Sequence, residues 1–412
     1  MLRRLHLVRR FLALVRTDPA GFRAGFVAHL LATATGLVAG LTLGAITGTL
    51  DQLPGLLVLV PAAVGLRGNV FGALSSRLGT LVATGTFTVS RRRDTEVGQN
   101  IWASLALSLS LSLALAFIAK GVAESFGVRN AIGIEDFIIV SIVGALIPSV
   151  VVLAITVGVA ALGVQRDWDI DNVSVPTVTA AGDVVTLPSL FLATYLVRDM
   201  PGWVHAAFAI PAAAVGVGAL LAGLRSHLPV VRRIVRESLP FLLLAGTIST
   251  LAGVTIQARF DSLQREPALL IVVPPLLSLA GSLAGILSAR ISTKMHLGVI
   301  EPSRLSVRPI AEDLTLVFLV AIPTFLVLGI VADVLAAVAD LQSPGVVEML
   351  GLMLLAGVMA TSLSCVVAYL VGFVTYRLGW DPDNNGIPLV SSASDFLGAT
   401  ALTVSIAILG LS

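Results

Sequence analysis

Residues 168–183 read WDIDNVSVPTVTAAGD, and residues 380–395 read WDPDNNGIPLVSSASD. The two blocks align without a gap at an offset of 212 residues. A second pair lies earlier in each half, where residues 61–80 read PAAVGLRGNVFGALSSRLGT and residues 274–293 read PPLLSLAGSLAGILSARIST, at an offset of 213. Two matched pairs at nearly one offset indicate an internal duplication.

The composition excludes a soluble globular protein. Of the 412 residues, 56% are hydrophobic and only 12% are charged, against about 25% charged in soluble domains. The apolar runs last 20 residues or more, which predicts transmembrane α-helices rather than the short alternating strands of a membrane barrel. The lone Cys365 cannot form an intramolecular disulfide. No basic stripe with interleaved aromatic residues suggests nucleic-acid binding.

The fold class expected is an all-α polytopic membrane protein with about eleven spans. The apolar stretches lie at 24–49, 55–88, 100–120, 137–164, 173–197, 204–224, 238–258, 268–289, 311–339, 346–374 and 385–411. Leu and Ala alternate with Ser from Leu105 to Leu115, but a helix is expected there, with each hydroxyl bonded to a carbonyl one turn back.

The duplication predicts four parts in the chain. They are a basic cytoplasmic segment at 1–23, a five-helix repeat at 24–197, a linker with one transmembrane helix at 198–237, and a second five-helix repeat at 238–411. Five crossings would invert a directly joined second copy. The added crossing returns the chain to its starting face, so we expect two parallel repeats related by a pseudo-two-fold axis along the membrane normal.

The distribution of Lys and Arg predicts the orientation. With the N-terminus in the cytoplasm, 19 of the 26 Lys and Arg residues fall in inner segments and five in outer ones. This bias favours a cytoplasmic N-terminus and an external C-terminus. The expected location is the plasma membrane.

Asp183 and Asp395 occupy matched positions deep inside apolar runs. Eleven residues separate Asn172 from Asp183, about 16 Å of helix, which places the carboxylate near the middle of a ~30 Å hydrocarbon core. Such a charge costs roughly 2.5–3.5 kcal/mol to insert. We therefore predict that both aspartates bind a cation in a wet pathway; the alternative is a hydrogen bond to a neighbouring helix.

Further polar residues accompany the two aspartates. Those predicted to line the pathway are Asn172 and Thr179, their matches Asn384 and Ser391, and the second-helix residues Asn69 and Ser282. An acidic vestibule is predicted at Asp169, Asp171, Asp381 and Asp383. Capping of the helix N-termini is the alternative for these acids. For Asn69 the alternative is hydrogen bonding between helices. With no Cys/His cluster, the hard oxygen ligands favour Mg²⁺, Mn²⁺ or Ca²⁺, and few protein ligands suit hydrated Mg²⁺ best.

At these residues the chain resembles the MgtE-type divalent-cation transporters, in particular their fused-duplication branch, solute carrier family 41. The resemblance rests on Gly68–Asn69, Ser288–Thr293, Asp381–Asn384 and the two deep aspartates. It implies that Asp183 and Asp395 bind Mg²⁺ and that a monomer suffices for the pathway, because one chain supplies what two subunits supply elsewhere. Ser282 stands where the family's second copy usually keeps asparagine, and no cytosolic sensor of the kind that bacterial members carry is expected in this chain.

The predicted function is transport of Mg²⁺ or a similar divalent ion between the two repeats, by a channel-like mechanism. A first alternative is an exchanger driven by Na⁺ or H⁺. A second is a structural or sensory membrane protein that transports nothing. No Ser/His/Asp, HExxH or phosphate-loop pattern occurs, so the chain is not expected to be an enzyme.

Overall fold

A computed structural model describes residues 19–88, 90, 92–166, 170–198, 201–296, 298, 300, 310–379 and 386–411, without the side chains of 19–29, 166, 170–176, 289, 292, 293 and 296. The first half holds α2 (Pro19–Ala45), α3 (Thr47–Gln52), α4 (Leu56–Ala83), α5 (Glu96–Ser125), α6 (Ile134–Arg166) and α7 (Ile170–Arg198). After α8 (Gly202–Leu224), the second half holds α9 (Pro229–Gln257), α10 (Phe260–Arg265), α11 (Ala268–Ile271), α12 (Val273–His296), α13 (Ala311–Val338), α14 (Val346–Leu378) and α15 (Ile387–Leu409).

The helices confirm the predicted fold class. In the described ranges, ten helices are long and apolar enough to cross a membrane, and a shorter apolar stretch, Leu30–Ala45, lies in α2. The serine-rich run from Leu105 to Leu115 is part of α5, as predicted. There the hydroxyl of Ser112 donates to the carbonyl of Ser108, one turn back, at 2.7 Å. A helix thus satisfies its own polar groups, which lipid requires. The chain is a multi-pass membrane protein.

The first helix of each half packs on the second helix of the other half. A Cβ on Gly40 of α2 would overlap the carbonyl oxygen of Ile271, and a Cβ on Gly253 of α9 would overlap that of Val58 in α4. Gly253 lies 213 residues after Gly40, and Ile271 lies 213 residues after Val58. We call such matched residues counterparts; they lie 213 residues apart through α5 and 212 apart in α7. The absence of a side chain at both glycines lets the backbones touch.

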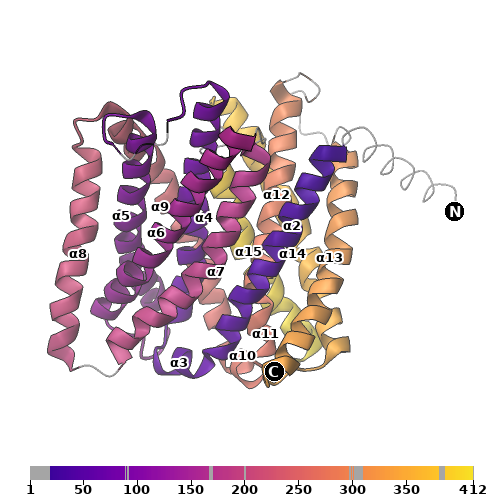
Figure 1. Cartoon of the computed structure of the whole chain (residues 1–412). Coiled ribbons are helices and arrows are strands. Elements are labelled where there is room, and N and C mark those ends of the chain that lie inside the picture. The colour runs from indigo at the N-terminus through magenta and orange to yellow at the C-terminus, as the bar shows by residue number, and fades with distance from the viewer. Residues whose placement is uncertain are drawn as a thin grey trace.

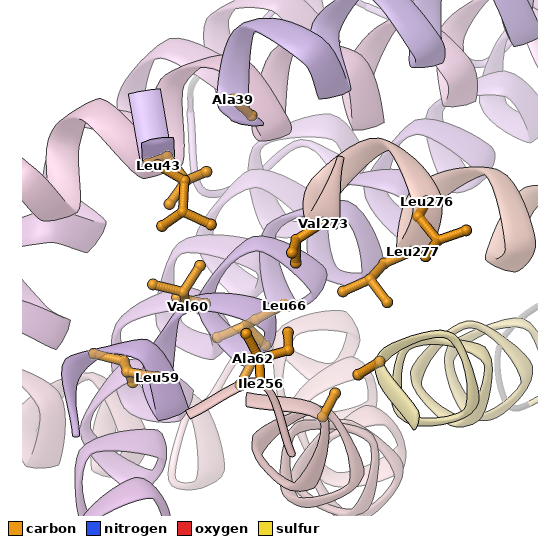
Figure 2. Packing of buried hydrophobic residues seen from close by; sticks show 14 of the residues in the cluster. Ala39, Leu43, Leu59, Val60, Ala62, Leu66, Ile256, Val273, Leu276 and Leu277 are labelled. Carbon is orange, nitrogen blue, oxygen red and sulfur yellow. The ribbon is translucent and has the colours of Figure 1, made fainter. Parts of the chain in front are cut away.

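The apolar core lies between the two halves. Ala39 and Leu43 of α2 and Leu59 to Leu66 of α4 belong to one buried cluster with Ile256 of α9 and Val273 to Leu277 of α11–α12. Figure 2 shows side chains of this cluster on helices of both halves. Both halves contribute to the cluster, so neither half keeps this core when taken alone.

Two helices, α8 and α13, lie at the edges of the bundle (Figure 1). α8 packs against α5 and α6 and lies at one edge, with α13 at the opposite edge (Figure 1). Both helices are mostly exposed in the structure, as expected for helices that face lipid. α4, α7 and α15 lie nearer the centre, where the candidate site residues are found.

The matched arginines near one end of α4 and α12 make matched contacts. Arg77 Nε donates to Asn100 Oδ1 at 2.8 Å, and Arg290 Nη1 donates to Asp313 Oδ1 at 3.2 Å. Asn100 and Asp313 are counterparts. Lys294 also pairs with Asp313. The same helix-to-helix contact therefore uses an amide in the first half and a carboxylate in the second.

Candidate functional site

The two deep aspartates lie on the last helix of each half. Asp183 is near the middle of α7 and Asp395 is in the first half of α15. Their residues are 6% and 9% exposed. Both lie in helices that are long and apolar enough to cross a membrane, so a carboxylate here needs specific partners or an ion.

Each carboxylate contacts the second helix of the other half. Ser278 Oγ of α12 donates to Asp183 Oδ2 at 3.5 Å. On the other side, Gly65 of α4, the counterpart of Ser278, faces Asp395, and a Cβ there would lie 3.4 Å from Oδ2. Asp395 instead accepts a hydrogen bond from Ser249 Oγ of α9 at 3.0 Å.

Both carboxylates lie on helices that pack against α4. No hydrogen bond among the described residues reaches the Oδ1 atom of either aspartate. The structure thus buries each of the matched acids beside the second helix of the other half, with one oxygen bonded and one oxygen without a donor among the described residues.

Thr179 and Ser391 lie one turn before the aspartates and make matched contacts. A Cβ on Gly68 would lie 3.5 Å from Thr179 Cγ2, and a Cβ on its counterpart Gly281 would lie 3.5 Å from Ser391 Oγ. Both hydroxyl residues are half-buried. Neither hydroxyl has a hydrogen-bond partner in the part of the chain that the structure describes. Both therefore remain able to bond a water molecule or a hydrated ion.

Asn69 and Ser282 differ, although they are counterparts. Asn69 follows Gly68 on α4, is half-buried, and makes no hydrogen bond within the described ranges. The hydroxyl of Ser282 donates to the Leu279 carbonyl of its own helix at 3.0 Å. The amide is available to a ligand, whereas the serine hydroxyl is already bonded.

The predicted vestibule cannot be placed. Asp169, Asp381, Asp383 and Asn384 lie outside the described residues, and Asp171 and Asn172 are described only as backbone of α7. Their roles stay predictions.

Sequence reasoning missed the two serines that bond the carboxylates. Ser278 stands opposite Gly65 in the quoted blocks, so a mismatch near the aspartates was visible in the sequence. Ser249 carried no such signal, because only the packing of α9 against α15 brings it to Asp395.

Arg67 was also not predicted as part of a polar network. Its side chain is buried, at 1% exposure, and donates at 2.7 Å to the hydroxyls of Ser108 and Ser112 on α5. Its backbone neighbour Gly68 faces Thr179 of α7, whereas the guanidinium bonds to α5. No carboxylate within the described ranges pairs with it.

The oxygen atoms at the site suit a hard cation that keeps much of its water. Two carboxylates carry the charge to balance a divalent ion, two hydroxyls lie one turn away on the same helices, and an amide lies on α4. Among the described residues, no three His, Cys, Asp or Glu side chains gather as a metal cage. A site with so few protein ligands fits an ion that retains waters, as Mg²⁺ does.

Comparison with known proteins gives one family and several relatives. The family model "MgtE: Divalent cation transporter" matches residues 60–193 and 273–405, well over half of the chain. Solute carrier family 41 member 3 of Rattus norvegicus is 25% identical over 396 residues, which cover 88% of this chain and 83% of the rat protein. The Mus musculus protein of the same name is 26% identical over 379 residues, covering 85% and 74%. Solute carrier family 41 member 2 of Homo sapiens is 24% identical over 379 residues, covering 84% and 63%. No solved structure matches the chain significantly.

Proposed function

Because the chain belongs to the MgtE family of divalent cation transporters, we propose that its cargo is Mg²⁺ and that the ion crosses where the two halves meet. The halves are taken as two parallel repeats, 24–197 and 238–411, joined by the 198–237 linker, with the basic segment 1–23 before them. The matched contacts of Gly40 and Gly253 support this division.

One observation carries the proposal: Asp183 and Asp395 are buried at matched positions in apolar helices, each beside the second helix of the other half. Two like charges in a low-dielectric interior repel strongly. A divalent cation between them removes this repulsion and balances both charges. In this proposal the Oδ1 atoms hold the hydrated ion, and Asn69, Thr179 and Ser391 contact its water shell.

The proposed mechanism is channel-like. With the N-terminus in the cytoplasm, the C-terminus outside and the protein in the plasma membrane, the membrane potential drives a divalent ion inward by about 4.6 kcal/mol per 100 mV, twice the value for one charge. No second energy source is then needed. One chain contains both aspartates, so a monomer suffices, and no catalytic reaction is proposed.

The test is uptake of Mg²⁺ into proteoliposomes that contain a trapped Mg²⁺-sensitive dye. Asp183→Asn and Asp395→Asn keep the side-chain shape but remove one charge each, and each should lower uptake at least tenfold. Asp313→Asn is the matched control, because Asp313 is also a buried carboxylate and its counterpart is Asn100. We expect this control to transport like the wild type.

Wild-type uptake in both site variants would overturn the proposal. Parallel assays with Mn²⁺, Ca²⁺ and Co²⁺ measure selectivity. Current under voltage clamp without a Na⁺ or H⁺ gradient is expected for a channel, and a strict requirement for such a gradient would show an exchanger instead.

A further inference from the structure

Each carboxylate of the site accepts one serine hydroxyl, but the two serines are not counterparts. Asp395 is bonded by Ser249 of α9, whose counterpart is Gly36 of α2. Asp183 is bonded by Ser278 of α12, whose counterpart is Gly65 of α4. The duplication alone would have put the hydroxyls at one matched position, so the difference needs a physical reason.

The packing of α2 explains why position 36 carries no hydroxyl. A Cβ on Gly36 would lie 2.8 Å from Cα of Pro275 and 3.2 Å from its nitrogen, closer than non-bonded atoms tolerate. The counterpart of Pro275 is Ala62, and a serine is accommodated at 249 in the second half. The hydroxyl for Asp183 must therefore come from another helix, and Ser278 supplies it.

Position 65 shows the complementary arrangement. Gly65 leaves the place beside Asp395 without a side chain, and a Cβ there would meet Asp395 Oδ2 at 3.4 Å and Ser249 Oγ at 3.7 Å, both ordinary contact distances. Each aspartate therefore accepts one serine hydroxyl at its Oδ2 atom, although the serine comes from a different position in each half. A structural coincidence would not be expected to match the two carboxylates in this way.

We propose that Ser249 and Ser278 are positioning residues that hold the carboxylates of Asp395 and Asp183 with Oδ1 turned toward the ion. This inference rests on the proposed function. Without a fixed hydroxyl, mutual repulsion would turn the carboxylates apart, and each would have to be ordered again when the ion binds. Ordering one freed side chain corresponds to roughly two- to tenfold weaker binding. The serines act on affinity through the aspartates and are not themselves ligands in this scheme.

The experiment measures Mg²⁺ uptake by purified, full-length variants in proteoliposomes as a function of Mg²⁺ concentration. Ser249→Ala and Ser278→Ala should each raise the half-saturating concentration about two- to tenfold, while the maximal rate stays within about twofold. Ser249→Thr keeps the hydroxyl and should keep the wild-type half-saturation. The control is Ser405→Ala, since Ser405 is a buried serine on α15 whose hydroxyl faces Met359 Sδ.

A second variant moves the hydroxyl instead of removing it. In the double variant Gly65→Ser/Ser249→Ala, a serine at position 65 can donate to Asp395 as Ser278 donates to Asp183. The half-saturating Mg²⁺ concentration should then return toward the wild-type value. A purely structural role of Ser249 predicts no such rescue. Melting temperature and gel-filtration elution of each variant show that it is folded.

The outcomes separate this inference from the proposed function. Direct titration of detergent-purified protein with Mg²⁺ accompanies the uptake assay. If Asp183→Asn and Asp395→Asn abolish binding while both serine-to-alanine variants bind like the wild type, the positioning role is wrong and the proposed site stands. Failure of Gly65→Ser to restore affinity also overturns the positioning role. If the wild type neither binds nor transports Mg²⁺, the proposed function fails, and the inference fails with it.

Discussion

At the scale of single residues, Arg67 shows how far the two halves have diverged. Arg67 bonds to Ser108 and Ser112. In the second half the counterparts of these three residues are, in the same order, Ala280, Ala321 and Phe325, and all three are buried. An aromatic ring and two methyl groups thus fill the place of a guanidinium and two hydroxyls. Since one half packs well without a charge, the fold itself does not require Arg67.

Replacing Arg67 with methionine should therefore leave the fold intact. Arg67→Met removes a buried charge that has no counter-ion, and such replacements are often neutral or stabilising. The serines keep other partners, because Ser112 Oγ donates to the Ser108 carbonyl at 2.7 Å and the Ser108 and Ser149 hydroxyls are 2.7 Å apart. The melting temperature in detergent should stay equal or rise. A fall of about 10 °C, several kcal/mol for a chain of this size, would contradict this account.

At the scale of helices, glycine residues allow the closest backbone contacts between the two halves. α9 contacts α4 at Gly253, and α2 contacts α11 at Gly40, where a Cβ would overlap a carbonyl oxygen of the partner helix. Larger apolar side chains elsewhere on the same helices belong to the buried core. The crossing of the two halves therefore depends on a few small residues, while the apolar character of each helix depends on many.

Gly253→Ala should destabilise the protein strongly, because the added Cβ would overlap the Val58 carbonyl, which belongs to backbone that cannot turn aside. The matched control is Gly218→Ala on α8, where a Cβ meets nothing within 4 Å. There alanine should be neutral or stabilise by about 0.4–1 kcal/mol. Melting temperature and yield of monodisperse protein compare the two. Equal behaviour of both variants would show that the close approach at Gly253 is not required.

At the scale of the whole molecule, the halves are interlocked. The first helix of each half packs against the other half. The carboxylate of Asp183 on α7 accepts a hydrogen bond from Ser278 of α12, 95 residues farther along the chain. Neither half contains a complete core or a complete pair of aspartates. We therefore expect the protein to fold as one cooperative unit and not as two domains in series.

The interlocking predicts that residues 1–225 alone will not fold. In that fragment α4 lacks α9, and α2 lacks α11 and α12, so large apolar faces stay open. Co-expression with residues 226–412 supplies the missing helices and should restore a monodisperse complex. Gel filtration of a fluorescently tagged fragment, with and without its partner, measures this. A stable, monodisperse 1–225 fragment on its own would refute the interlocked fold.

Much of the site was readable from the sequence because it depends on local patterns repeated twice. Long apolar runs predicted the helices, and the quoted blocks predicted that Asp183 and Asp395 are matched. The bonding of these aspartates was not predictable, because Ser249 lies 146 residues from Asp395 and its hydroxyl reaches the carboxylate only through the packing of α9 against α15. The partners of Arg67 were hidden for the same reason.

The sequence by itself determined that this protein spans a membrane as α-helices, that it is duplicated, and that it carries an acid at one matched place in each copy. Hydrophobicity and helical spacing act within a single segment, so they are visible in the order of residues. Only the tertiary structure decided that the first helices pack against the other half, that each acid lies beside the second helix of the other half, and that unmatched serines bond the acids. These contacts depend on how closely two backbones approach each other. The contact between Gly36 and Pro275, for example, can be seen only in three dimensions.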